Sequence, residues 1–230
     1  MIKPSKIYKM RIVFHLAADA PGRADVVGML RTWILKSGLP FARAKQNPKA
    51  PRIAYGPGIK RGQFATREYA ELYLFTSVSA QKARTRLESC KPQGLTLLDA
   101  KRVPFALAGV QQLASVVAYE VQGDFASYHP TQTLENYVAS PRLEVTRTAP
   151  GGLRMTTDLK PFVRSARLAD ATHVQLMLNR VDERWISPLE LISAWLGEDF
   201  STSEDTADAR FTIIRQGLYW QDSQDSLHLI

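Results

Sequence analysis

Apolar residues recur with two different periods in the first hundred residues, and these periods predict the elements. Strands are expected where apolar residues alternate or form short runs, and helices where they recur every three to four positions. The predicted order is strand, helix, strand, strand, helix, strand, over residues 7–16, 24–37, 52–55, 65–76, 79–90 and 95–103. This is the order of the split βαβ, or ferredoxin-like, unit.

Residues that start and stop helices frame both predicted helices of this half. Gly38 follows the first helix, and Pro40 prevents its continuation. Ser79 is the predicted N-cap of the second helix, and the turn sequence Pro92-Gln93-Gly94 ends it.

The second half begins a similar order with an irregularity. Thr131 is the predicted N-cap of a helix to residue 139, and Ser187, Pro188 and Glu190 predict a capped helix to residue 196. Strands are predicted over residues 116–121, 142–148, 153–159, 160–168 and 173–181, with a last one from residue 211.

The predicted elements favour an α+β fold of two ferredoxin-like (split βαβ) units in tandem. We place the first unit at residues 1–108 and the second, irregular unit at residues 109–230. The strand predicted near residues 160–168 is the irregular feature of the second unit.

Charge separates the two halves of the chain. Residues 1–100 contain 18 Lys and Arg against 6 Asp and Glu, whereas residues 101–230 contain 12 against 16. The first half is therefore basic and the second acidic. A basic half is typical of proteins that bind nucleic acid or an acidic partner surface.

The basic residues are concentrated between Phe41 and Arg67, a segment without a single acidic residue. Basic and aromatic side chains mixed in this way are typical of single-strand nucleic-acid binding, because cations contact phosphates and rings stack on bases. With a basic residue before the segment, the candidate nucleic-acid or phosphate-binding residues are Arg23, Arg43, Lys45, Lys49, Arg52, Tyr55, Lys60, Arg61, Phe64 and Arg67. The alternative is a solvated loop between strands.

Several function classes lack the residues they need. A single cysteine, Cys90, excludes an internal disulfide framework and a cysteine-ligated iron–sulfur cluster. The four histidines share no metal-ligand spacing, and phosphate-loop and zinc-protease motifs are absent. We therefore expect no metal, no cofactor and no catalytic residue. No apolar run reaches the ~20 residues of a membrane span, so we expect a cytoplasmic protein that does not contact a membrane.

Short motifs spread over nearly the whole chain resemble those of the radical-SAM-linked domain family, a bacterial family of unknown function. The matching segments are Met10-Arg11-Ile12, Asp25, Ser37-Gly38-Leu39-Pro40, Pro51-Arg52-Ile53-Ala54-Tyr55, Glu68-Tyr69, Thr157-Asp158-Leu159-Lys160-Pro161-Phe162, Ser187-Pro188 and Arg215-Gln216-Gly217-Leu218-Tyr219. The order and spacing of these segments carry the resemblance.

The resemblance implies a partner. Members are fused behind, or encoded beside, a radical SAM protein, so it implies an iron–sulfur enzyme acting in trans. It implies no catalytic residues. Two histidines of the family pattern are replaced here, because Arg23 and Lys49 stand at those places. These replacements retain or add positive charge, which suits recognition better than catalysis.

Three hypotheses follow. The first is a non-catalytic accessory module that binds RNA or another polyanion through its basic half and works with a radical SAM protein. The second is a protein–protein adaptor that docks on that enzyme without nucleic acid. The third is a metal-free RNA-processing nuclease, with His15 as general base and Lys45 or Arg52 stabilising charge.

Overall fold

The fold is mixed α+β, as the sequence predicts, and the chain divides into two compact units. A computed structural model describes residues 6–17, 25–59, 63–148, 154–200 and 210–230. Unit 1 comprises Met1–Ala114 with Ile230, and unit 2 comprises Ser115–Leu229. None of the helices in these described ranges has the length and apolar character that a membrane span needs.

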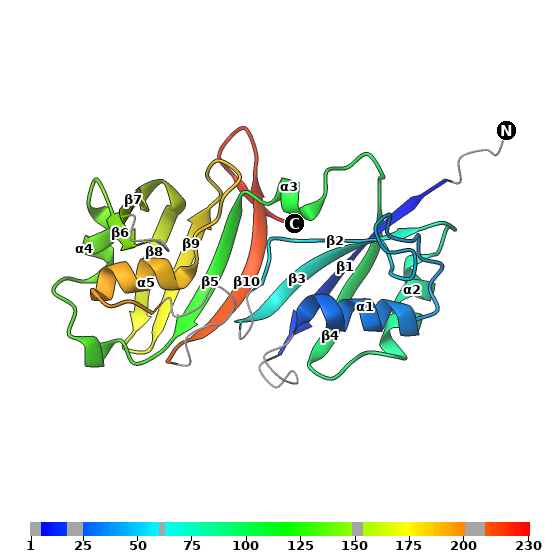
Figure 1. Cartoon of the computed structure of the whole chain (residues 1–230), viewed down its shortest axis with the longest axis horizontal. Helices are drawn as coiled ribbons and strands as arrows, with labels where there is room; N and C mark the ends of the chain where they lie inside the picture. Colours follow the sequence, from blue (N-terminus) through cyan, green and yellow to red (C-terminus); the bar gives the residue numbers. More distant parts are fainter. Residues whose placement is uncertain (1–5, 18–24, 60–62, 149–153, 201–209) are drawn as a thin grey trace. The chain divides into compact units, whose positions relative to one another are not determined.

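Unit 1 contains one antiparallel sheet with two longer helices. Its elements are β1 (Tyr8–Leu16), α1 (Val26–Lys36), β2 (Ile53–Tyr55), β3 (Gln63–Leu74), α2 (Ala80–Glu88), β4 (Leu95–Val103) and the short α3 (Val110–Leu113). The strands lie in the order β4-β1-β3-β2, and every neighbouring pair is antiparallel. Figure 1 shows α1 and α2 on the same face of this sheet.

The core of unit 1 lies between the sheet and these two helices. Alternate residues of β1 point to the helices because side chains of a strand alternate between its faces, and Met10, Ile12 and Phe14 are buried there. The ring of Trp33 on α1 packs edge-on against Phe14, with ring centroids 6.5 Å apart. Its indole N–H donates a hydrogen bond of 2.8 Å to the carbonyl oxygen of Leu87 on α2, which joins the two helices.

The helix signals of unit 1 act as predicted. Gly38 follows α1 with a φ of 62°, a left-handed conformation that favours glycine. The hydroxyl group of Ser37 donates to the carbonyl oxygen of Ile34 at 2.7 Å and accepts from the N–H of Leu39 at 3.3 Å. Ser79 caps α2 by accepting a hydrogen bond from the N–H of Lys82 at 3.2 Å.

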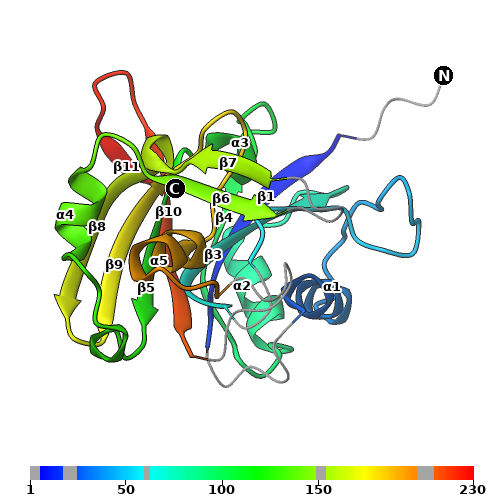
Figure 2. The same cartoon turned by 60° about the vertical axis from the view of Figure 1, so that its left-hand side comes forward.

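Unit 2 contains a second set of antiparallel strands and a separate hairpin. These strands follow the order β11-β10-β5-β9-β8, and β6 pairs only with β7 (Figure 2). Its elements are β5 (Val116–Gln122), the 3₁₀ turn η1 (Ala126–Tyr128), α4 (Leu134–Ala139), β6 (Glu144–Thr148), β7 (Arg154–Asp158), the 3₁₀ turn η2 (Lys160–Phe162), β8 (Val163–Asp170), β9 (His173–Asn179), α5 (Pro188–Leu196), β10 (Thr212–Gln221) and β11 (Leu227–Leu229). The sequence Pro150-Gly151-Gly152 predicts a hairpin turn between β6 and β7, and the acidic stretch 201–209, rich in Ser and Thr, predicts a loop. Both segments lie outside the described residues.

Of the two helices described in unit 2, α4 starts later than predicted, and α5 starts where predicted but without the predicted capping box. The N-cap of α4 is Thr133 and not Thr131, because its hydroxyl group accepts from the N–H of Asn136 at 3.3 Å and the buried Leu134 then becomes the first helical residue. Ser187 is the N-cap of α5 and Pro188 its first residue, as predicted. The predicted capping box is wrong, since the Ser187 side chain makes no capping hydrogen bond.

The strand predicted over residues 160–168 begins later, because η2 comes first. Pro161 has no N–H for a sheet and lies in this turn. The turn is fixed by Asp158, whose Oδ1 accepts the backbone N–H groups of Leu143 and Lys160, each at 2.9 Å. These two hydrogen bonds hold the pKa of Asp158 below its usual value. The motif Thr157–Phe162 thus connects the hairpin to β8.

The turn between β8 and β9 gives a prediction for the pH dependence of stability. Asp170 Oδ1 accepts from His173 Nδ1 at 2.9 Å, and from the N–H and the hydroxyl group of Thr172 at 2.8 Å each. These bonds lower the pKa of Asp170 to about 2. A depressed carboxyl pKa stabilises the fold above the unfolded pKa, and this stabilisation is lost as the pH falls through the folded one. The urea midpoint of Asp170→Ala should therefore lie below that of the wild type at pH 6, and the difference should shrink as the pH falls from about 4 to about 2.

The variant Asp170→Asn separates the charge from the hydrogen bonds at this turn. Its amide oxygen still accepts the N–H of Thr172 but does not titrate. It should recover part of the stability lost in Asp170→Ala, with a difference from the wild type that again depends on pH. A difference from the wild type that stays constant between pH 2 and pH 6 in both variants would contradict the assignment.

Candidate nucleic-acid interface

The first part of the predicted basic segment forms a loop along the outer edge of β3. The N–H of Ala42 donates to the carbonyl oxygen of Tyr73 at 2.6 Å, and the N–H of Tyr73 donates to that of Arg52 at 3.2 Å. The N–H of Arg52 in turn reaches the carbonyl oxygen of Ala42 at 2.7 Å. These backbone bonds fix both ends of the loop, so its lysines project from a defined place beside the sheet.

A basic pocket lies between this loop, β2 and α1. We call it the basic pocket; its volume is about 440 Å³. The described residues that line it are Arg31, Ala44, Lys45, Gln46, Asn47, Ala50, Pro51, Arg52, Ile53 and Tyr55. Three of them are cations, and none of these described residues is acidic. Such a pocket attracts anions, phosphate groups among them.

Tyr55 connects the pocket to α1. Its hydroxyl group is hydrogen-bonded to Arg31, one turn into the helix. Burial raises the pKa of Tyr55, while the hydrogen bond and the charge of Arg31 act in the opposite direction. The phenol therefore stays protonated near neutral pH and places a neutral aromatic ring beside the cations.

The predicted binding residues divide into two groups. Lys45 and Lys49 are exposed on the loop. Three arginines have partners within the fold: Arg43 donates to the carbonyl oxygen of Pro48 at 2.7 Å, and Arg52 stacks on Tyr73 with 4.1 Å between its guanidinium carbon and the ring centroid. The third, Arg67, donates to the Tyr69 hydroxyl group at 2.8 Å. These contacts give the arginines a structural role, and Arg52 lines the basic pocket as well.

The structure does not bring all of the predicted residues together. Phe64 is half-buried on β3 and lines neither this pocket nor the cavity below. Arg23, Lys60 and Arg61 lie outside the described residues. Arg31 lines the basic pocket but is not among the residues predicted from the sequence; it is an exposed residue of α1 and stands outside the basic segment.

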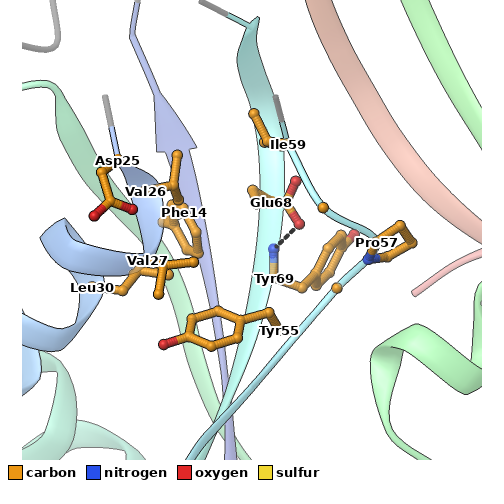
Figure 3. Close-up of a pocket in the computed structure, with 12 residues that line it drawn as sticks. Phe14, Asp25, Val26, Val27, Leu30, Tyr55, Pro57, Ile59, Glu68 and Tyr69 are labelled. Atoms are coloured by element: carbon orange, nitrogen blue, oxygen red, sulfur yellow. Dashed lines mark hydrogen bonds between the residues drawn. The ribbon is translucent and has the colours of Figure 1, made fainter. Parts of the chain in front are cut away.

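An apolar cavity adjoins the basic pocket and shares Tyr55 with it (Figure 3). Its volume is about 130 Å³. The described lining residues are Phe14, Asp25, Val26, Val27, Leu30, Tyr55, Gly56, Pro57, Gly58, Ile59, Glu68 and Tyr69. Two of these described residues are carboxylates, Asp25 and Glu68, and none of them is a cation.

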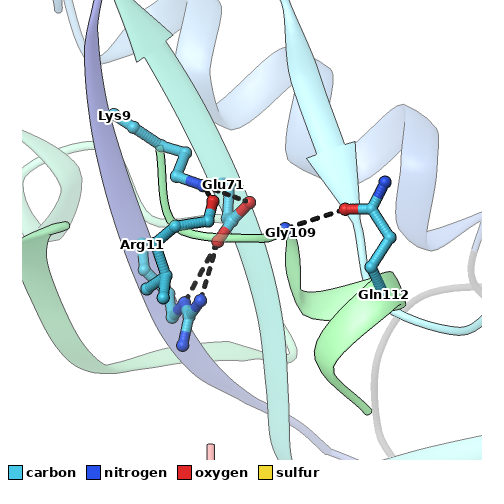
Figure 4. Close-up of polar contacts among 6 residues, drawn as sticks. Lys9, Arg11, Glu71, Gly109 and Gln112 are labelled. Carbon is cyan, nitrogen blue, oxygen red and sulfur yellow. Dashed lines mark hydrogen bonds and ion pairs between the residues drawn. The ribbon is translucent and has the colours of Figure 1, made fainter. Parts of the chain in front are cut away.

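The sheet face opposite the helices contains a buried ion cluster, formed by Lys9, Arg11 and Glu71 (Figure 4). Nε and Nη2 of Arg11 donate to Oε1 of Glu71 at 3.2 Å and 2.9 Å. Lys9 Nζ lies 3.6 Å from Oε2 of the same carboxylate. The side chains of Lys9, Arg11 and Glu71 are only 2%, 5% and 0% exposed, so solvent screens these charges little.

The segment after β4 covers this cluster. Lys9 Nζ donates a hydrogen bond to the carbonyl oxygen of Leu107, and the ring of Phe105 meets Tyr73 edge-on, with centroids 6.2 Å apart. A Cβ atom on Gly109 would lie 3.4 Å from Oε2 of Glu71, and α3 contacts β2 and β3. The sheet face opposite the helices is thus closed at its centre in unit 1, so bases cannot stack on the sheet there.

The histidines and the cysteine contribute little to this region. His15 is half-buried at the end of β1 and lines neither the basic pocket nor the apolar cavity. Burial raises the pKa of Cys90, and the charge of Lys36 acts in the opposite direction. Among the described residues, no three His, Cys, Asp or Glu side chains gather as a metal site would require.

Comparison with protein families identifies the chain. Residues 22–188 match the family described as an uncharacterized protein conserved in bacteria, DUF2344. The chain belongs to this family. The matched range contains the basic loop (residues 42–52), β2, β3 and the Asp158 turn. A comparison with curated proteins found no match.

The ion cluster gives a prediction for stability. Glu71→Gln keeps the size of the side chain but leaves two buried cations without a counter-charge, which costs about 3–5 kcal/mol for a buried pair. Urea unfolding monitored by tryptophan fluorescence should show this loss. The exposed pair Arg84–Asp99 is the matched control, and Asp99→Asn should cost less than about 1 kcal/mol. Equal losses in the two variants would contradict a structural role for the cluster.

Proposed function

We propose that this protein is a non-catalytic recognition module that binds RNA through the basic pocket of unit 1. The observation that carries the proposal is the grouping of Arg31, Lys45 and Arg52 around Tyr55, with no acidic residue among the described lining residues. Phosphate contacts supply most of the affinity in such a site, and an aromatic ring beside them allows a base to stack.

We also propose that both units are ferredoxin-like. In unit 1 the strand order β4-β1-β3-β2, with a helix in each crossover, is that of a split βαβ unit. In unit 2 the order β10-β5-β9-β8 is equivalent, because β5, β8, β9 and β10 take the places of the first to fourth strands, with α4 and α5 in the crossovers. The β6–β7 hairpin and β11 are then additions. The irregularity of this unit is the hairpin, and β8 is a regular strand.

The partner that we propose is a radical SAM protein, an iron–sulfur enzyme that acts on the RNA in trans. This part of the proposal comes from the order of short motifs along the chain. Several of these motifs have structural tasks here: Arg11 pairs with Glu71, Ser37 and Gly38 end α1, and Asp158 fixes a turn. The motifs therefore describe a scaffold, which suits an accessory role.

RNA binding that depends on salt is the first test. For single strands, each phosphate contact contributes about 0.7 to the slope of log K against log salt concentration. The triple variant Arg31→Gln, Lys45→Gln, Lys49→Gln should bind a single-stranded RNA more weakly than the wild type at 50 mM salt. Its salt slope should be smaller by roughly 2. Fluorescence anisotropy with a labelled oligonucleotide measures both quantities.

The control removes the same charge elsewhere on unit 1. Lys82, Lys91 and Lys101 are exposed and line neither pocket, so their joint change to Gln should leave most of the affinity intact. Equal losses in the two triple variants would show general attraction by net charge and contradict the pocket. Absence of binding by the wild type at 50 mM salt would reject RNA as the ligand and favour the adaptor hypothesis.

A further inference from the structure

The apolar cavity beside the basic pocket has the dimensions of a site for one aromatic ring. Its volume is about 130 Å³. An apolar protein cavity of about 150 Å³ is known to take up benzene, so the volume suits a single six-membered ring. The walls suit such a ring, since Val26, Val27 and Leu30 lie on one side and Pro57 and Ile59 on the other (Figure 3).

The two carboxylates of the cavity determine which ring it favours. Asp25 precedes α1 and Glu68 lies on β3, so they approach from different elements (Figure 3). Glu68 Oε1 accepts the N–H of Tyr69 at 2.9 Å, which fixes that side chain. Asp25 is the N-cap residue of α1 but makes no capping hydrogen bond with its side chain. A carboxylate that is ionised only accepts hydrogen bonds, so Asp25 favours a ring that carries a donor.

Tyr55 links this cavity to the phosphate-binding side. It lines both spaces, and the charges of Asp25 and Arg31 shift the pKa of its hydroxyl group in opposite directions. A ligand that fills both spaces must therefore combine a donor-bearing ring with an anionic group a short distance away. A nucleotide has this combination.

We propose that the apolar cavity binds one cytosine base of the RNA whose phosphates lie in the basic pocket, an inference that rests on the proposed function. Cytosine has one ring, which fits the volume, and its N4 amino group donates to a carboxylate. Uracil has an oxygen in place of that amino group, and its only ring N–H lies between two carbonyl oxygens that repel a carboxylate. Purines carry two rings and are larger than the single ring that this volume suits.

The test compares two RNAs that differ only in their bases. Hexacytidylate and hexauridylate carry the same backbone charge, so phosphate contacts in the basic pocket contribute equally to the affinity for each. We expect the wild type to bind hexacytidylate about ten-fold more tightly than hexauridylate in fluorescence anisotropy at 100 mM salt. Asp25→Asn should reduce this ratio to within about two-fold, because an amide offers donor and acceptor equally.

A second variant fills the cavity without changing charge. Val27 lines the cavity and is partly exposed, so Val27→Trp should remove the preference for hexacytidylate while the salt slope remains that of the wild type. Leu98→Trp is the matched control, because Leu98 is an exposed apolar residue on β4 outside the cavity, and its ratio should stay near ten-fold.

The outcomes separate the inference from the function on which it rests. Equal affinity of the wild type for the two RNAs, with a steep salt dependence that the Arg31, Lys45 and Lys49 variant loses, overturns the cytosine site and leaves RNA binding in place. Loss of the preference in Leu98→Trp as well as in Val27→Trp also overturns it. No affinity for either RNA at 50 mM salt rejects the proposed function and the inference together.

Discussion

The carboxylate of Glu71 constrains how β1 pairs with β3 in unit 1, because it is fully buried between two cations of β1. Burying three charged groups is expensive unless they pair, so Lys9 and Arg11 must keep their register against β3. Lys9 also ties down the segment after β4 through the carbonyl oxygen of Leu107. One ion cluster thus sets the pairing of two strands and closes one sheet face (Figure 4).

Closure of that face directs binding to another part of unit 1. With the helices on one side of the sheet and residues 104–113 on the other, the exposed cations of the basic loop lie at the β3 edge. Here Tyr55 lies between two spaces: the described residues of one include cations, and those of the other include carboxylates. Neither space alone identifies a ligand. Together they fit a molecule that is anionic at one end and a hydrogen-bond donor at the other.

Local sequence patterns predict most helices and strands, whereas they do not predict contacts between residues far apart in the sequence. Glycine, serine and the helical period located α1 and α2, but nothing local indicates that Arg11 meets a carboxylate 60 residues away. The basic loop stood out because its residues are contiguous. Arg31 did not stand out, since it lies on α1 and comes close to the loop only in the folded unit. Arg52 shows the opposite problem. Its place in a basic run predicts a ligand-binding residue, yet its guanidinium group also stacks on Tyr73 within the fold.

The central claim is that RNA lies at the β3 edge of unit 1 and not on the closed sheet face. Ultraviolet cross-linking of the full chain to a single-stranded RNA, followed by mass spectrometry of the peptides, tests this claim most directly. The account predicts cross-links in the peptide that contains Tyr55 and in that of the 44–50 loop. Cross-links concentrated at Phe105, or in unit 2, would contradict it.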